Sequence, residues 1–182
     1  MPRKNKKLPR HLLVIRTSAM GDVAMLPHAL RALKEAYPEV KVTVATKSLF
    51  HPFFEGGDVD FLDIETRRTH RGIRGAIRFA REAAELKIDA VADMHNVLRS
   101  KMVRAALHLR GIPVSVIHKG RIEKYMRLGR GSEGVKPLKH TVIRYCDVFR
   151  RLGFDFPDPR PAEKRPRPNP MGEKQGICIG FA

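Results

Sequence analysis

The sequence predicts an α/β fold in which helices cover both faces of a parallel sheet. Short apolar runs alternate along the chain with longer segments in which apolar residues recur at helical spacing. The short runs are continuously apolar rather than alternating, which is typical of strands buried on both faces. This alternation favours a Rossmann-like sheet, and ligands of such sheets bind at the carboxyl ends of the strands.

Five segments are predicted to be strands, because each is a short apolar run that contains valine or isoleucine. They are residues 12–15, 42–45, 61–64, 90–92 and 114–117. The loops that follow the first, third and fourth of these strands are expected to line the binding site.

Four helices are predicted from helical spacing of apolar residues: 21–37, 73–84, 97–109 and 142–152. Pro27 has no backbone N–H, which predicts a distorted first turn or a later start for the first helix. In the second helix, steps of four, three and four residues predict a buried stripe of Ile73, Ile77, Ala80 and Ala84. Gly153 is expected to terminate the fourth helix as its C′ residue.

The two ends of the chain differ in composition from the segment between them. Residues 1–10 are basic and are predicted to be flexible, whereas residues 11–156 carry the strand and helix pattern. Six prolines fall within residues 157–170, which predicts a semi-extended linker over residues 157–174. Residues 175–182 have the composition of a buried strand, which either folds back onto this domain or begins a second one.

The composition limits the partners that the protein can have. Its 182 residues contain 36 lysines and arginines against 19 aspartates and glutamates, a formal net charge of +17. This excess implies a polyanionic partner, namely nucleic acid, an anionic membrane surface, or a phosphorylated or carboxylated substrate. The two cysteines exclude a disulfide scaffold, and no Cys/His spacing predicts a metal site. Charges interrupt every apolar stretch before ~18 residues, so no transmembrane helix is expected and the cytoplasm is the simplest location.

The loop after the first strand has two interpretations. Asp22 follows Gly21 at or near the start of the first helix. It either caps that helix or acts as a general base at the carboxyl end of a strand. Gly21 is expected to permit positive φ and a close backbone approach. The glycine spacing of a Walker loop or a dinucleotide fingerprint is absent.

Basic and polar side chains follow the third and fourth strands. Arg67, Arg68 and Arg71 lie on the loop after the third strand, where guanidinium groups suit phosphate or carboxylate. The arginines at positions 74, 78 and 81 form one face of the next helix, which we interpret as a solvated face. The segment after the fourth strand supplies further candidates, either as turn formers or as residues of the cleft. These are Asp93, His95, Asn96 and Arg99.

Four segments resemble, in the same order, those of the lipopolysaccharide heptosyltransferases, glycosyltransferase family 9. The first is Ser18-Ala-Met-Gly-Asp22-Val with Pro27, and the second is Asp93-Met-His-Asn-Val-Leu-Arg-Ser100. The third is His140-Thr-Val-Ile-Arg144, and the fourth is Ile177-Cys-Ile-Gly-Phe-Ala182, which lacks the family's proline. The resemblance extends over nearly all of residues 12–182.

The resemblance implies the N-terminal, acceptor-binding domain of a two-domain GT-B glycosyltransferase, with residues 175–182 as the first strand of a missing donor-binding domain. It implies inverting, metal-independent transfer of sugar from an ADP-heptose-type nucleotide-sugar donor to an anionic lipid A core acceptor. No cofactor is implied, because the donor is a substrate bound mainly by the missing domain. Asp22 becomes the expected catalytic base. The implied acceptor-binding residues are Ser18, Gly21, Arg67, Arg68, Arg71, Asp93, His95, Asn96 and Arg99.

The resemblance also implies a cytoplasmic protein with peripheral contact at the inner membrane, and it implies that the 182-residue chain alone is inactive. Two other functions stay open. A nucleic-acid-binding module fits the charge, but Trp is absent and no helix-turn-helix, RRM or KH pattern occurs, so nucleic acid is not expected. A stand-alone anion- or glycan-binding domain would bind saccharide without catalysing transfer.

Overall fold

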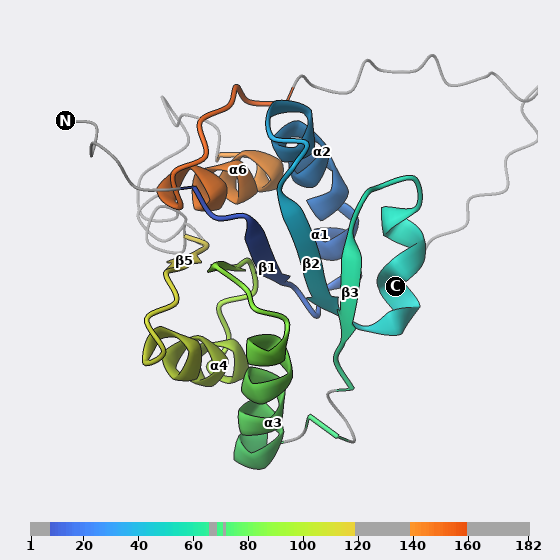
Figure 1. Ribbon diagram of the computed structural model, residues 1–182. Helices are drawn as coiled ribbons and strands as arrows, with labels where there is room; N and C mark the ends of the chain where they lie inside the picture. The colour runs from blue at the N-terminus through green and yellow to red at the C-terminus, as the bar shows by residue number, and fades with distance from the viewer. Residues whose placement is uncertain (1–7, 66–68, 71, 119–138, 160–182) are drawn as a thin grey trace, which may run out of the picture.

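A five-stranded parallel sheet in the order β3-β2-β1-β4-β5 forms the centre of the computed structural model (Figure 1). The structure describes residues 8–65, 69, 70, 72–118 and 139–159. All five predicted strands are confirmed within one residue at each end. Their bounds are β1 His11–Ile15, β2 Lys41–Thr46, β3 Asp60–Asp63, β4 Ala90–Asp93 and β5 Val114–Val116.

The strand order reverses beside β1, which pairs with β2 on one side and with β4 on the other. The chain first builds outward through β2 to β3 and then returns to add β4 and β5 on the far side of β1. Ile15 at the end of β1 is in register with Asp93 at the end of β4. Loops that leave these two strands diverge to opposite faces, which opens a crevice where ligands of such sheets bind.

Two helical layers cover the sheet, because successive residues of the buried strands point to opposite faces. Leu12 and Val14 of β1 pack into the core beneath α2 and α6, whereas Leu13 and Ile15 pack beneath α3 and α4. A short helix α1 precedes α2, and a 3-10 segment η1 follows β2. The bounds are α1 Met20–Ala24, α2 Leu26–Ala36, η1 Ser48–Phe54, α3 Gly72–Glu85, α4 Leu98–His108 and α6 Thr141–Arg151.

The helix predicted over residues 21–37 is two helices. The break falls at Met25, and Pro27 lies in the first turn of α2, where its missing N–H costs no helical hydrogen bond. The later start that Pro27 predicted is therefore correct for α2, while Gly21 and Asp22 belong to the separate five-residue α1.

The buried face of α3 differs from the predicted stripe. Ile73 and Ile77 are 69% and 49% exposed, and the core side of the helix carries mainly small residues. They are Gly75, Ala76, Phe79, Ala80 and Ala83. Gly75 explains this orientation, because a Cβ atom there would overlap the backbone of His70 in the preceding loop. Close packing against the loop requires glycine, so the helix turns its small residues inward and leaves both isoleucines outside.

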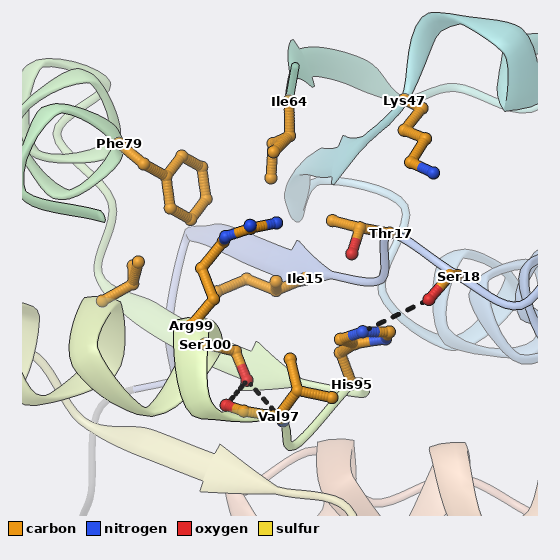
Figure 2. A pocket seen from close by; sticks show the side chains of 11 residues that line it. Ile15, Thr17, Ser18, Lys47, Ile64, Phe79, His95, Val97, Arg99 and Ser100 are labelled. Atoms are coloured by element: carbon orange, nitrogen blue, oxygen red, sulfur yellow. Dashed lines mark hydrogen bonds between the residues drawn. The ribbon is translucent and has the colours of Figure 1, made fainter. Parts of the chain in front are cut away.

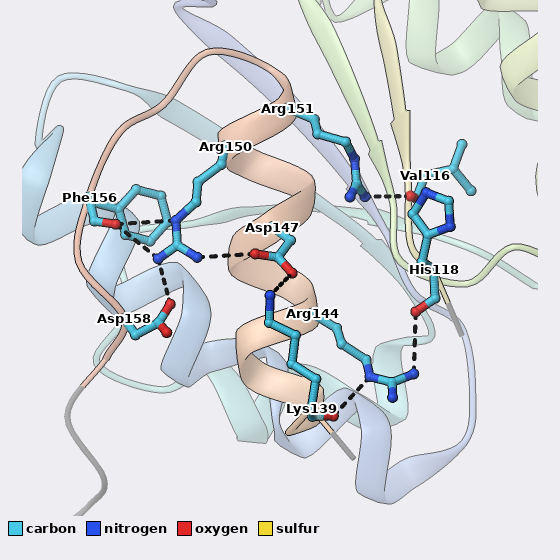
Figure 3. A network of polar contacts seen from close by, with 9 residues as sticks. All are labelled: Val116, His118, Lys139, Arg144, Asp147, Arg150, Arg151, Phe156 and Asp158. Carbon is cyan, nitrogen blue, oxygen red and sulfur yellow. Dashed lines mark hydrogen bonds and ion pairs between the residues drawn. The ribbon is translucent and has the colours of Figure 1, made fainter. Parts of the chain in front are cut away.

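A network of polar contacts fixes α6 to the rest of the domain (Figure 3). Arg150 donates to the Phe156 carbonyl at 2.9 Å and pairs with Asp158 at 2.6 Å, while Arg151 donates to the Val116 carbonyl of β5 at 2.6 Å. Gly153 ends the helix with φ of +109°, as expected of a C′ residue. The described chain thus stays packed as far as Phe156.

The predicted flexible segment 1–10 falls mostly outside the described residues, as do most of the linker over 157–174 and the whole strand over 175–182. Within the part of the chain that the structure describes, no helix has the length and apolar character needed to cross a bilayer.

Candidate functional site

A cavity of about 140 Å³ lies at the carboxyl ends of the strands, where the loops after β1, β2, β3 and β4 meet helices α3 and α4 (Figure 2). Its position agrees with the expectation that the loops after the first, third and fourth strands line the site. The residues that line it are Ile15, Thr17, Ser18, Lys47, Ile64, Phe79, His95, Val97, Arg99, Ser100 and Val103.

The lining combines positive charge and hydroxyl groups with an apolar wall. Arg99 extends its guanidinium toward the space below Ile64 and beside Phe79, and Lys47 faces the same space from the loop after β2 (Figure 2). None of the described lining residues is acidic. A cavity with this lining favours an anionic group such as a carboxylate or a phosphate.

The loop after β4 is held by Asp93. This side chain has no exposed surface, and its carboxylate accepts hydrogen bonds from the backbone N–H groups of His95 at 2.9 Å and Asn96 at 2.8 Å. Arg104 donates to the other carboxylate oxygen at 3.2 Å. Asn96 adopts φ of +47°, a left-handed turn that asparagine tolerates, and donates to the Ile117 carbonyl at 3.3 Å.

These contacts revise the expected roles of two residues. Asp93 was expected to bind acceptor, but its fully buried carboxylate already binds its own loop, so it positions His95 instead of contacting a ligand. Asn96 forms the turn and links it to the residue after β5. His95 and Arg99 do line the cavity, as expected.

Ser18 and Ser100 organise the two walls of the cavity. The Ser18 hydroxyl lies 3.4 Å from Nε2 of His95, which links the loop after β1 to the loop after β4. The Ser100 hydroxyl accepts from the Val97 N–H and donates to the Val97 carbonyl, both at 3.0 Å, and so begins α4. The fixed first turn of α4 directs Arg99 into the cavity.

Asp22 lies in α1, on the helix that continues from the Ser18 loop, and its side chain is 44% exposed. Its carboxylate pairs with the buried guanidinium of Arg16, which also donates to the Met94 carbonyl at the end of β4. The hydroxyl of Tyr145 on α6 donates to the Asp22 carbonyl at 3.0 Å. The N-cap residue of α1 is Ala19, and Asp22 lies in the first turn with its carboxylate bound to Arg16, so the capping interpretation is wrong.

Gly21 also departs from its expected role. It is helical, its φ lies outside the left-handed region, and a Cβ atom there would meet nothing within 4 Å. The expectation of positive φ at this position is therefore wrong. Arg67, Arg68 and Arg71 lie outside the described residues, so their expected role stays a prediction.

The loop that carries Arg67 and Arg68 is fixed at its two described ends. Nδ1 of buried His70 accepts from the Glu65 N–H at 3.1 Å, so its Nε2 carries the proton and donates to Glu82 at 2.9 Å. Burial acts to raise the pKa of Glu82, but hydrogen bonds from Arg78 and His70 outweigh it and lower that pKa. The loop is thereby attached to α3, whose Phe79 lines the cavity.

Several residues of the site were not found from the sequence: Arg16, Lys47, Phe79, Arg104 and Tyr145. Arg16 follows directly after the first strand, and that position could have indicated it. Lys47 follows the second strand in the same way. The other three come from neighbouring helices and carry no local signal. Among the described residues, no three His, Cys, Asp or Glu side chains gather as a metal site would require.

Solved glycosyltransferase structures resemble this domain. A family 9 glycosyl transferase from Veillonella parvula matches with a TM-score of 0.58 and 17% identity, over 79% of this chain and 42% of its own. E. coli heptosyltransferase WaaC, solved with ADP, matches with a TM-score of 0.54 and 23% identity, over 81% and 49%. E. coli ADP-heptose lps heptosyltransferase II matches with a TM-score of 0.50 and 20% identity, over 87% and 44%.

The chain has the α/β fold of these glycosyltransferases. It spans less than half the length of each of the three structures. No protein-family model matches the sequence, and no curated protein matches it either. The likeness to the glycosyltransferases therefore rests on the Rossmann-like fold alone. The cavity of this chain lies at the edge of the sheet where such folds bind ligands.

Proposed function

We propose that this chain is the acceptor-binding half of an inverting glycosyltransferase of the heptosyltransferase kind. The observation that carries the proposal is a carboxylate, Asp22, which is held by a buried arginine and lies four residues after Ser18, a residue in the lining of a cationic cavity. None of the described residues of that lining is acidic. The shared fold supports the same conclusion. In this arrangement the cavity binds the acceptor, and the Asp22 carboxylate on α1 acts as the base.

In the proposed reaction, Asp22 removes the proton from an acceptor hydroxyl while the hydroxyl oxygen attacks the anomeric carbon of the donor sugar. The bond from that carbon to the nucleotide breaks, and a nucleoside diphosphate leaves. Arg16 orients the carboxylate, which keeps 44% of its side chain exposed for the acceptor. Lys47 and Arg99 bind anionic groups of the acceptor, and His95 and Ser18 line the same cavity.

The proposed donor is an ADP-heptose-type nucleotide sugar. E. coli heptosyltransferase WaaC has been solved with ADP and with ADP-2-deoxy-2-fluoro heptose, which supports this class. We expect a second domain to bind the donor, so these 182 residues alone should not transfer sugar. The proposed acceptor is an anionic lipid A core saccharide, and the proposed location is the cytoplasm, at the surface of the inner membrane.

The test joins this chain to the donor-binding half of E. coli heptosyltransferase WaaC and measures ADP release from ADP-heptose with an inner-core acceptor. We expect turnover by the chimera and none by the 182-residue chain. Asp22→Asn should lower kcat by about 10²–10⁴-fold, the usual contribution of a general base. The variant should stay folded at the assay temperature, as its circular dichroism would show, although loss of the pair with buried Arg16 should lower its melting temperature. Asp58→Asn, at an exposed surface ion pair with Lys34, is the matched control and should leave kcat unchanged.

Two results would contradict the proposal. Near-normal turnover by Asp22→Asn would remove Asp22 from the role of base. The second result is a chimera that binds the acceptor but shows no turnover. If this chimera is folded by circular dichroism and binds ADP-heptose, the result would favour the stand-alone anion- or glycan-binding domain.

A further inference from the structure

The outward face of α3 carries two large apolar residues that the fold leaves uncovered. Ile73 and Ile77 are one helical turn apart and are 69% and 49% exposed. The solvent side of a helix in a soluble domain is normally polar. The close contact between Gly75 and His70 fixes the rotation of the helix, so the isoleucines cannot turn into the core.

Arginines lie beside these isoleucines on the exposed side of the helix. Arg74 and Arg81 are exposed, and Arg78 is exposed but paired with Glu82 at 2.9 Å. The sequence has no acidic residue from position 66 to position 81. The helix itself carries three arginines against Glu82, which pairs with Arg78, and Glu85, which is exposed one turn after Arg81. The outward face of α3 therefore joins exposed apolar area to a net positive charge, in a chain whose net charge is +17.

The placement of α3 relates this face to the cavity. The inward side of the helix contributes Phe79 to the cavity lining, and the outward side faces away from the sheet. Figure 1 shows α3 as the element farthest from α2 and α6, with α4 as its neighbour. A surface that contacts the outward face would lie directly behind the wall of the cavity.

We propose that the outward face of α3 docks on an anionic lipid surface. Isoleucine side chains would enter the boundary between headgroups and acyl chains, and the arginines would pair with lipid phosphates. Charge complementarity favours lipid over an apolar protein segment, which would not need the arginines. The isoleucines favour lipid over nucleic acid, whose backbone binds cations and gains nothing from exposed aliphatic groups.

The proposal specifies which surface makes the membrane contact expected of the proposed function. Its test measures lipid binding alone and requires no sugar transfer, so failure of either proposal is distinguishable from failure of the other. The whole 182-residue chain is sedimented with vesicles of phosphatidylcholine, or of phosphatidylcholine mixed with phosphatidylglycerol. We expect binding to the mixed vesicles and little to the neutral ones.

Two double variants separate the apolar and the ionic contributions. Arg74→Gln with Arg81→Gln should weaken partitioning by about 25-fold, since each arginine near an anionic surface contributes roughly five-fold. Ile73→Ser with Ile77→Ser should weaken it by a factor of about ten. The matched control is Leu49→Ser with Arg31→Gln, which removes one exposed apolar and one basic side chain from the opposite layer. It should stay within about two-fold of the wild type.

Equal binding to neutral and anionic vesicles would overturn the proposal. So would a loss of binding in the arginine variant with none in the isoleucine variant, because that pattern describes a purely ionic surface of the kind that nucleic acid uses. An unchanged melting temperature in both variants establishes that any loss of binding is not a loss of folding.

Discussion

Asp22 is positioned by Arg16, which is close in the sequence, and by Tyr145, which is distant in the sequence. Arg16 at the end of β1 holds its carboxylate, and the same guanidinium binds the Met94 carbonyl after β4. Tyr145 on α6 binds the backbone carbonyl of Asp22 at 3.0 Å. A carboxylate restrained in this way has a fixed orientation before substrate arrives, which is what a general base requires.

Tyr145 makes the stability of the domain dependent on pH in the alkaline range. Burial, assisted by the nearby Asp22 carboxylate and opposed by Arg16, raises the pKa of Tyr145 to about 12. The phenol of the unfolded chain ionises near ~10, so ionisation favours unfolding. The contribution of the neutral phenol to the unfolding free energy is complete below pH ~10. It is lost as the pH rises toward ~12, and the total loss is about 2–3 kcal/mol.

The Tyr145→Phe variant tests this prediction. At neutral pH it should lose about 1 kcal/mol of unfolding free energy, because the hydrogen bond to Asp22 is gone. Urea unfolding of both proteins from pH 7 to pH 11 gives the difference in unfolding free energy between them at each pH. The ionisation of the lysines affects both proteins equally and cancels in this difference. That difference should shrink above pH ~10. A constant difference would show that Tyr145 does not govern the alkaline loss.

At the scale of elements, α3 and the loop before it form one unit. His70 joins Glu65 to Glu82, and Gly75 allows the backbone of the helix to approach the backbone of the loop. This unit places Phe79 in the cavity wall and directs both isoleucines outward. The orientation of α3 thus depends on a contact between residues five positions apart.

Two glycine substitutions distinguish a required glycine from a permitted one. Gly75→Ala should lower the unfolding free energy by about 1–3 kcal/mol, because the new methyl group overlaps the backbone of His70. Gly21→Ala should raise it by up to about 1 kcal/mol, because the site is open and alanine favours a helix. Urea unfolding followed by circular dichroism measures both. A tolerated Gly75→Ala would mean that the loop can move away from α3.

At the scale of the whole molecule, the two helical layers share one sheet. Strands β1, β2 and β4 contribute alternate residues to the core beneath α2 and α6 and to the core beneath α3 and α4. Neither layer can lose its helices without exposing apolar faces of the same strands. The layers are therefore expected to unfold together, as small single domains usually do.

The positions of the tyrosines allow this cooperativity to be measured. Tyr37 and Tyr145 both belong to the layer of α2 and α6. In a Tyr125→Phe variant, tyrosine fluorescence reports that layer alone, whereas circular dichroism at 222 nm reports every helix. The two signals should give the same urea midpoint. Midpoints that differ would show that the layer of α3 and α4 unfolds separately.

The fold class and the location of the candidate site follow from the sequence alone. A strand that is buried on both faces of a sheet consists of consecutive apolar residues. The apolar runs of the sequence therefore predict all five strands. The chain order of strands and helices then placed the cavity at the carboxyl ends, with Ser18, His95 and Arg99 in its lining. The positions of the strands and of the cavity follow from the order and spacing of apolar residues along the chain, which can be read directly from the sequence.

Tertiary structure alone decided which polar groups bind one another and which face of α3 is buried. The sequence pattern predicts Asp93 as a ligand-binding residue, but its carboxylate lies inside its own loop, where Arg104 and two backbone N–H groups bind it. Ile73 and Ile77 matched a core stripe, but a backbone contact at Gly75 outweighed their hydrophobicity. Contacts between distant elements, such as Tyr145 with Asp22, depend on how the layers pack, and no periodicity in the sequence records that packing.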